Sequence, residues 1–331
     1  MIALKFHQDA AVGRVLERFL QTRDQLRLDV SDADRATARE AACVMLEAPT
    51  GAGKTLMAGT IAERFSAGEA VVWFWFAPFK GLVTQSGRFL RSQFKGLRVR
   101  DLRMDRDPGQ ARGGDLYVTT WAAVAASDAE GRKIRQKHES LPSLDAFVPL
   151  LRERGMRIGV VVDEAHHSFK KQTQALALFR DVLAPDYTLL VTATPDEDEM
   201  QAFARELGRP TPGRVVLTRE QAVGMGLVKR GIKAVAYLAD ASVERIVDYE
   251  KTALADGWRV HGEIRSALAR AGIPIVPLML VQVQTGGKRD DEARVRRKLI
   301  EIGVTERAIA VHTAQEPDPD VLAVAHDESK E

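Results

Sequence analysis

The chain has 331 residues, of which 45% are hydrophobic and 28% are charged, the composition of a folded globular protein and not of a disordered one. Its 48 Lys and Arg residues stand against 46 Asp and Glu residues, and this net charge of +2 excludes a polyanion-binding surface spread over the whole protein. The single cysteine, Cys43, excludes an intrachain disulfide and a cysteine-built metal site. No apolar run reaches the roughly 18 residues of a membrane span, so we expect a soluble, cytoplasmic protein with no membrane partner.

Short runs of β-branched and aromatic residues predict five strands, and several of these runs show no alternation of polar and apolar residues. Such runs are typical of parallel strands that are buried on both faces. Amphipathic segments at 56–65, 82–94 and 175–182 predict helices between them. The pattern indicates an α/β fold, a parallel sheet sandwiched by helices, with strands at 43–47, 70–76, 116–119, 158–162 and 188–192.

A second domain is expected after the glycine- and proline-rich segment at 208–213, which supplies turn chemistry at every position. We therefore predict a first domain over 1–213 and a second over 214–331. In the second, helices are expected at 243–271 and 294–302, and strands at 215–217, 232–237, 275–283 and 308–310.

The strand at 43–47 runs into Ala-Pro-Thr-Gly-Ala-Gly-Lys-Thr at 48–55, and a helix follows. A strand, a glycine-rich turn and a helix in this order are the context of a phosphate-binding loop (P-loop). Glycines allow backbone N–H groups to converge on phosphate oxygens at the positive end of a helix dipole. We expect Lys54 to neutralise the β- and γ-phosphates and Thr55 to ligate Mg²⁺. The other nucleotide contacts are expected from Thr50, Gly51, Ala52 and Gly53.

Two adjacent carboxylates, Asp163 and Glu164, follow the strand at 158–162. Parallel α/β sheets hold their ligands at the carboxyl ends of the strands, where this strand delivers both groups. We expect Asp163 to hold Mg²⁺, usually through water, and Glu164 to orient and deprotonate the attacking water. A zinc site that includes His166 and His167 is the weaker interpretation, because the His-Glu-x-x-His spacing on one helix face is missing.

Together these segments resemble the motifs of superfamily-two helicases and translocases of the DEAD/DEAH-box type. Residues 48–55 resemble motif I, and Asp-Glu-Ala-His at 163–166 resembles motif II. Thr-Ala-Thr at 192–194 resembles motif III, which couples hydrolysis to strand movement. The resemblance implies a RecA-like domain that uses ATP and Mg²⁺, with Lys54 and Glu164 as catalytic residues and with coupling through His166, Thr192 and Thr194.

Three weaker motifs follow the order of the same family. Residues 76–85 are similar to motif Ia, and a pair of threonines stands where motif Ib is expected. Near the N-terminus, Phe6 and Gln8 are similar to the adenine-reading motif, in which the glutamine amide bonds the adenine edge and the aromatic ring stacks on the base. Motifs Ia and Ib grip one nucleic-acid strand through its phosphates, which implies contacts at Pro78, Lys80, Thr119 and Thr120.

Within the superfamily, residues 151–168, 226–229 and 277–283 are most similar to the restriction subunit of type III restriction enzymes and to related helicases. That resemblance implies a motor acting on nucleic acid, with DNA favoured over RNA, within a restriction or phage-defence enzyme. A modification methyltransferase subunit is then a candidate partner.

Residues 88–112 carry eight basic and three acidic side chains, a local excess of +5. Because they follow motif Ia, we expect them to lie against a phosphate backbone. A solvated helix face is the alternative, and we favour it for a second basic group at 132–137. The alternating Trp73 and Trp75 are expected in the core, whereas the role of Trp121 is open.

The second domain is expected to be an incomplete RecA-like domain. In the family, motif V carries a Gly-x-Asp element and motif VI supplies arginine fingers, and we find neither pattern after Val283. Arginine fingers contribute on the order of 10³–10⁵ to the rate of related phosphoryl transfers. We therefore predict an ATP-dependent motor module that binds ATP and, as an isolated chain, hydrolyses it slowly. A non-motor ATP-binding module, or an inactive fragment, is the alternative.

Overall fold

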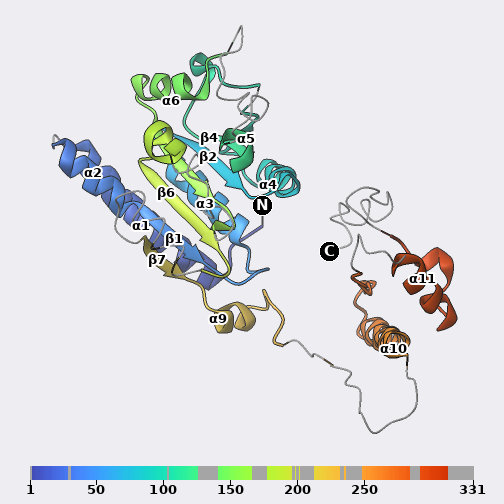
Figure 1. The fold of residues 1–331 in the computed structure, drawn as a ribbon. Helices are drawn as coiled ribbons and strands as arrows, with labels where there is room; N and C mark the ends of the chain where they lie inside the picture. The colour runs from blue at the N-terminus through green and yellow to red at the C-terminus, as the bar shows by residue number, and fades with distance from the viewer. Residues whose placement is uncertain are drawn as a thin grey trace. The chain divides into compact units, whose positions relative to one another are not determined.

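The computed structural model describes residues 2–28, 31–102, 104–125, 141–165, 177–195, 198, 201, 212–231, 235, 248–283 and 291–311. The chain divides into two compact units, Met1–Ile232 and Lys233–Glu331 (Figure 1).

The centre of the first unit is a seven-stranded sheet in the order β3-β4-β2-β5-β6-β1-β7. Every pair of neighbouring strands is parallel. The strands are β1 (Cys43–Glu47), β2 (Val71–Ala77), β3 (Arg98–Arg100), β4 (Asp115–Thr120), β5 (Arg157–Val162), β6 (Tyr187–Thr192) and β7 (Gly213–Val216). The five strands predicted for the first domain are confirmed, each within one residue at either end, and the parallel α/β fold is confirmed with them.

Helices cover both faces of this sheet (Figure 1). One face packs against α1 (Phe6–Arg27), α3 (Lys54–Ser66), α4 (Lys80–Gln93) and α9 (Arg219–Gly224). The other face packs against α5 (Trp121–Ala125), α6 (Leu144–Glu153) and η3 (Leu178–Leu183). The remaining short elements are α2 (Asp32–Ala41), which contacts α1, and η1 (Pro108–Gln110).

The helix predicted at 175–182 differs from the structure. Its first two residues lie outside the described part of the chain, and residues 178–182 belong to the π-helix η3. The helix is wide because backbone groups bond five residues apart, as Ala184 N does to Phe179 O at 2.9 Å.

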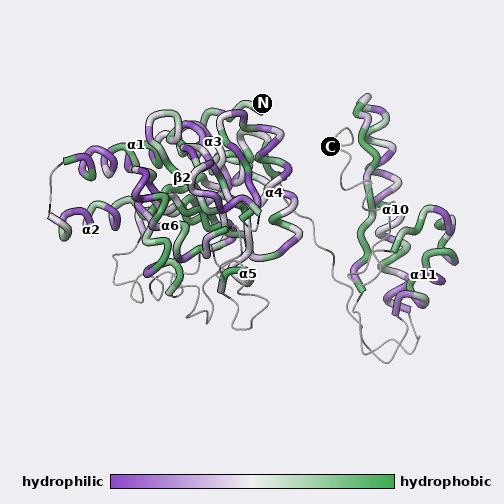
Figure 2. The backbone as a smooth tube through the Cα atoms, turned by 90° about the horizontal axis from the view of Figure 1, so that it is seen from above, coloured by the Kyte–Doolittle hydropathy of each residue, from purple (hydrophilic) through white to green (hydrophobic). Residues whose placement is uncertain are grey.

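Strand β2 shows how the sequence builds two cores. Val71, Trp73 and Trp75 point to the face of α1 and α3, and the alternate residues point to the face of α5 and α6. Figure 2, which colours the backbone by hydropathy, accordingly shows hydrophobic residues around β2 at the centre of the first unit. Gly159 on the neighbouring strand makes room for Trp73, since a Cβ there would lie 2.3 Å from the indole. The prediction that Trp73 and Trp75 belong to the core is confirmed.

Trp121, whose role the sequence leaves open, is also a core residue. Its ring stacks on Phe76 with centroids 3.8 Å apart and an interplanar angle of 9°, and the side chain is buried. Trp121 therefore belongs to the core between β2 and α5, where it is not presented to a nucleic-acid base.

The strand expected to open the second domain belongs to the first sheet. β7 pairs with β1, with Leu46 opposite Val215. Turn residues precede strands within a domain as well as between domains, so a turn-rich segment does not by itself mark a domain boundary. The two compact units divide near residue 232.

The described part of the second unit contains α10 (Tyr249–Arg270), α11 (Asp291–Glu301) and η4 (Glu306–Ala308), and no strand. Leu254, Val295 and Leu299 form its core, and Arg294 and Lys298 of α11 pair with Glu250 of α10. The helices expected at 243–271 and 294–302 correspond to α10 and α11.

The strands expected at 275–283 and 308–310 are not formed. A strand needs a hydrogen-bonding neighbour, and the described residues offer none to 275–283, where Leu278 is 78% and Leu280 is 91% exposed. The strand expected at 232–237 lies outside the described residues, apart from Val235. A second RecA-like sheet is therefore not observed in the described part of this unit.

None of the helices in the described residues is long and apolar enough to cross a membrane.

Candidate nucleotide-binding site

The predicted motifs meet at the carboxyl edge of the sheet. Because neighbouring strands are parallel and in register, the loops that follow them leave from the same edge. The P-loop follows β1, the two carboxylates follow β5, and the motif III residues follow β6. The register that aligns these strand ends pairs Glu47 with Thr192, Phe76 with Val162, and Ala77 with Thr120.

The P-loop turns into α3 through two glycines with left-handed backbone. Gly51 has φ +83° and Gly53, the N-cap of α3, has φ +78°, a region that residues with a Cβ rarely adopt. The first turn of α3 contains no acidic residue. The N–H groups at this end of the helix lack intrahelical partners and carry the positive end of its dipole, so the loop is built to receive an anion.

Gln8 connects the start of α1 to the P-loop. Its Oε1 accepts from Lys5 N at 2.8 Å, and its Nε2 donates to Ala52 O at 2.9 Å. A Cβ on Gly53 would lie 2.7 Å from the same Nε2. The Gln8 side chain is 2% exposed, whereas Phe6 is 78% exposed. The amide expected to read the adenine edge thus bonds the loop itself, and the Phe6 ring is the part of the motif open to a base.

Lys54 and Glu164 form an ion pair across the site. Lys54 Nζ lies 3.5 Å from Glu164 Oε1, and the lysine side chain is 8% exposed. Asp163 continues the alignment of β5, since its N–H donates to Phe76 O at 2.8 Å. Glu164 then has φ +48°, an uncommon backbone conformation for a residue other than glycine. Such conformations cluster at functional sites.

Burial first, and the adjacent Glu164 charge second, raise the pKa of the Asp163 carboxyl from 3.8 to about 6. A hydrogen bond from Glu164 N and the charge of Lys54 oppose that change. A desolvated carboxylate beside a second carboxylate is costly to ionise, and a cation would remove that cost. The donor set of Asp163 and the half-buried Thr55 hydroxyl fits Mg²⁺, which keeps waters and phosphate oxygens as its other ligands.

A second kind of metal site would be built from protein side chains alone. The described residues contain no group of three or more His, Cys, Asp or Glu side chains placed to hold an ion. His166 and His167 lie outside the described residues, so the position of the predicted coupling residue His166 is not given.

Motif III lies directly beside the P-loop. Ala48 N donates to Thr192 O at 3.1 Å, which joins the first residue of the P-loop segment to the end of β6. The Thr192 hydroxyl accepts from Thr194 N at 3.2 Å and shapes the turn after the strand. The structure therefore brings Thr192 and Thr194 to the site, and a backbone hydrogen bond joins the P-loop segment to the end of β6.

The predicted nucleic-acid contacts separate into buried and exposed residues. Thr119 is 7% and Thr120 is 6% exposed, and the Thr120 hydroxyl accepts from Ala123 N at the start of α5. Lys80 is exposed at the start of α4 and Pro78 is half-buried before it. Phe79, which the sequence reasoning missed, is 61% exposed, and its place between two predicted contact residues was the available signal.

The basic segment at 88–112 does not form one phosphate-binding surface. Arg98 makes a two-pronged contact with the buried Asp115 through Nε at 2.5 Å and Nη2 at 2.6 Å, and Arg100 pairs with Asp105 at 3.2 Å. Arg106 is buried and donates to Leu102 O at 2.6 Å. These arginines stabilise the fold. The exposed cations that remain in the described part of the segment are Arg88, Arg91, Lys95 and Arg112.

A buried carboxylate at the amino edge of the sheet was also missed. Asp186 is fully buried and accepts from Arg39 Nε and Arg152 Nη1, each at 3.0 Å, and from Ile158 N at 2.9 Å. Its arginine partners lie 147 and 34 residues away in the sequence, so no local pattern indicates the cluster. It lies at the opposite end of β5 and β6 from the nucleotide site.

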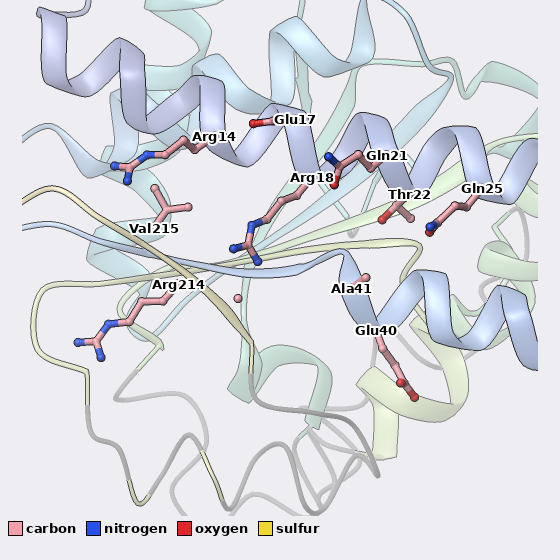
Figure 3. A pocket seen from close by; sticks show the side chains of 11 residues that line it. Arg14, Glu17, Arg18, Gln21, Thr22, Gln25, Glu40, Ala41, Arg214 and Val215 are labelled. Carbon is pink, nitrogen blue, oxygen red and sulfur yellow. The ribbon is translucent and has the colours of Figure 1, made fainter.

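A cleft of about 630 Å³ lies between α1 and β7 (Figure 3). Its lining includes Arg14, Arg18 and Arg214 but no residue of the P-loop and neither carboxylate after β5. Arg14 donates to Val216 O at 3.0 Å, and Arg214 pairs with Glu47 at 2.6 Å. Two of the three cations thus hold the edge strand of the sheet to its neighbours, and the cleft is separate from the nucleotide site.

The fold and the site define a helicase-like P-loop NTPase module with a RecA-like sheet. The chain belongs to the family described as type III restriction enzyme, res subunit, whose model matches residues 1–197. This confirms the family that the motifs predicted. No curated protein matches the chain.

Two solved structures show similarity at low identity. The helicase domain of Pyrococcus furiosus Hef is 16% identical, with a TM-score of 0.37, over 88% of this chain and 57% of that one. The DUF1998 helicase MrfA, in a structure bound to DNA, is 13% identical, with a TM-score of 0.35, over 60% of this chain and 29% of that one. The chain thus matches little more than half of the first structure and less than a third of the second.

Proposed function

We propose that this chain is the ATP-binding and ATP-hydrolysing module of a nucleic-acid motor, with DNA favoured over RNA. The observation that carries the proposal is the meeting of three side chains at one sheet edge. Lys54 Nζ lies 3.5 Å from Glu164 Oε1, and Asp163 is the preceding residue on the same strand end. A P-loop cation, a metal-binding carboxylate and a second carboxylate are the parts that phosphoryl transfer to water requires.

Each side chain has a separate role. Lys54 and the start of α3 bind the β- and γ-phosphates. Thr55 and Asp163 would hold Mg²⁺, which when bound neutralises charge on the phosphate oxygens. Glu164 orients the attacking water and accepts its proton. Lys54 has one positive charge for two anionic partners, so it exchanges Glu164 for phosphate when the nucleotide is bound. That exchange frees the Glu164 carboxylate to accept the proton of the attacking water.

The nucleic-acid contact is proposed for the segment after β2. Pro78, Phe79 and Lys80 follow a strand whose end is paired in register with β5, the strand that carries the two carboxylates. An exposed cation binds phosphate and an exposed ring stacks on bases without reading sequence. The chain belongs to the family described as type III restriction enzyme, res subunit, and on that ground we also propose a modification methyltransferase subunit as a partner of the motor.

A non-motor ATP-binding module is the second candidate. It is favoured by one observation, the absence of any strand among the described residues of Lys233–Glu331, where a motor needs a second sheet to close on the nucleotide.

Hydrolysis measured with and without nucleic acid separates the two candidates. The purified chain is assayed for phosphate release from MgATP alone, with single-stranded and duplex DNA, and with RNA of the same sequence. A motor is expected to hydrolyse faster with DNA, and a non-motor module is expected to ignore it. Lys54→Ala should lose ATP binding. Unchanged ATP binding in Lys54→Ala would overturn both candidates, because both place the phosphates on this lysine.

A further inference from the structure

The segment that follows α9 lies against the P-loop. We call residues 225–229 the exit segment, because the chain passes through them before it leaves the first unit. Leu227 N donates to Ala222 O at 2.9 Å, and Arg219 Nη2 donates to Lys229 O at 3.1 Å. Ala222 is fully buried in the core that the sheet forms with α1 and α3. The exit segment is therefore held to α9, and α9 is held to the core.

The exit segment lies beside the P-loop and is bonded to the start of α1. A Cβ built on Gly51 would lie 3.7 Å from Val228 Cγ1 and 4.0 Å from Leu227 O, so these two residues flank the side of Gly51 that lacks a side chain. Lys5 Nζ donates a hydrogen bond to Met225 O. Lys5 precedes α1, the helix in which Gln8 bonds Ala52 of the same loop.

Three segments that are far apart in the sequence thus lie together around the P-loop. Residues 5–8 bond the P-loop at Ala52, the exit segment lies beside it at Gly51, and Lys5 bonds the exit segment at Met225. Gly51 gains its conformational freedom from the missing Cβ, and the same freedom makes the loop costly to order. Contacts on both sides of a glycine-rich loop reduce that cost before the phosphates arrive.

We propose that the exit segment braces the P-loop in its phosphate-binding conformation, with Val228 as a positioning residue. The inference rests on the proposed function, because it assigns the phosphate site to the P-loop. It adds that phosphate affinity depends on Val228, which lies 177 positions beyond Gly51, in the segment that leads out of the first unit. The brace acts on the loop and not on the base, so its loss weakens every triphosphate equally.

The test compares two valine-to-alanine variants. Val228 and Val99 are both half-buried and pack against the same core, but Val99 lies on β3, at the other end of the strand order from β7. Binding of MgATP, MgGTP and magnesium tripolyphosphate is titrated by calorimetry. Val228→Ala should weaken all three by a common factor of roughly three to ten, the equivalent of one or two lost contacts. Val228→Ile keeps a β-branched side chain at this position and should retain wild-type affinity. Val99→Ala should also bind all three ligands as the wild type does.

Three outcomes would overturn the inference. The first is wild-type affinity of Val228→Ala for all three ligands. The second is an equal loss of affinity in Val99→Ala, which would indicate general destabilisation. A loss confined to MgATP would indicate that the segment contacts the base. The proposed function fails in a different way, if the wild-type chain binds no tripolyphosphate or if Lys54→Ala binds it as well as the wild type.

Discussion

Lys54 Nζ and Glu164 Oε1 lie 3.5 Å apart, so the lysine of the P-loop is paired with the carboxylate that follows β5. Both groups come from the carboxyl edge of one sheet, and the lysine is the more deeply buried of the two, with 8% of its side chain exposed against 26% for the glutamate. The pair is therefore partly screened by solvent on the glutamate side. A charged phosphate can compete for the lysine without first breaking a fully desolvated contact.

The buried Asp163 should cost the protein stability at neutral pH. Its pKa is raised from 3.8 to about 6, so the folded state binds this proton more tightly than the unfolded state does. Stability from this group is then greatest at low pH and is lost as the pH rises towards 6. Asp163→Asn removes the charge at nearly constant shape and should raise the free energy of unfolding by up to about 3 kcal/mol at about pH 7.5, with most of that gain gone by about pH 4. Urea unfolding at both pH values, without Mg²⁺, measures the difference, and a less stable variant at the higher pH would refute the sign.

The cluster around Asp186 should be essential to the fold and separate from function. Asp186→Asn leaves Arg39 and Arg152 without their charged partner, and breaking a buried pair of this kind costs about 3 kcal/mol. The matched control is Asp181→Asn, which removes an exposed carboxylate paired with Arg180 and should leave the melting temperature unchanged. Thermal unfolding of both variants checks the prediction. Equal melting temperatures for the two variants would show that burial of Asp186 contributes nothing.

Lys80 and Lys95 give a matched pair for the nucleic-acid contact. Both are exposed lysines, Lys80 as the first residue of α4 and Lys95 just beyond its other end. If the carboxyl edge faces the strand, Lys80→Ala should weaken DNA binding and lower the slope of log affinity against log salt by about 1. Lys95→Ala should change neither quantity. Fluorescence anisotropy over a salt series gives both numbers, and equal effects of the two substitutions would argue for a diffuse contact along α4.

Gln8 should contribute to the binding of the phosphates more than to the recognition of the base. Gln8→Ala removes the hydrogen bonds to Lys5 N and Ala52 O, so the loop loses one of its supports. We expect MgATP and MgGTP to lose affinity together, by roughly fivefold, because the hydrogen bond to Ala52 O contributes about 1 kcal/mol. Gln93→Ala is the control, because Gln93 also bonds a backbone N–H, that of Ile2, but on the surface. A loss for MgATP alone would instead support the adenine-reading role that the sequence resemblance implies.

The strands and the P-loop were predictable because their signals are local. A strand buried on both faces, such as β2, must be apolar throughout, and the P-loop must place glycines at fixed positions before its lysine. The position of Asp163 and Glu164 followed from the rule that parallel strands deliver their ligands at one edge.

The features that were missed depend on distant partners. Asp115 lies just outside the basic segment at 88–112 and pairs with Arg98, so counting charges within the segment overestimated the free positive charge. The pairing of β7 with β1 and the placement of Val228 beside Gly51 bring together residues more than 160 positions apart, which no local pattern encodes. The strand expected at 275–283 had the right apolar residues but lacks a neighbour in the described part of its unit.

The slow hydrolysis predicted for the isolated chain has a simple check. Phosphate release by the purified chain at saturating MgATP and DNA should remain far below that of motors that use an arginine finger, because the sequence shows no motif VI pattern. Fast, DNA-stimulated turnover by this chain alone would show that the missing charge is supplied from within it.

The most direct test of the account is a single-turnover measurement on Glu164→Gln. The substitution keeps the shape of the side chain and removes its ability to accept a proton, so it isolates the role of Glu164 as a base from the binding of phosphate by Lys54. With DNA present, the variant should bind MgATP at least as tightly as the wild type and cleave it slower by a factor on the order of 10²–10⁴. Cleavage of bound ATP at the wild-type rate would contradict the assignment of Glu164 and, with it, the proposed mechanism.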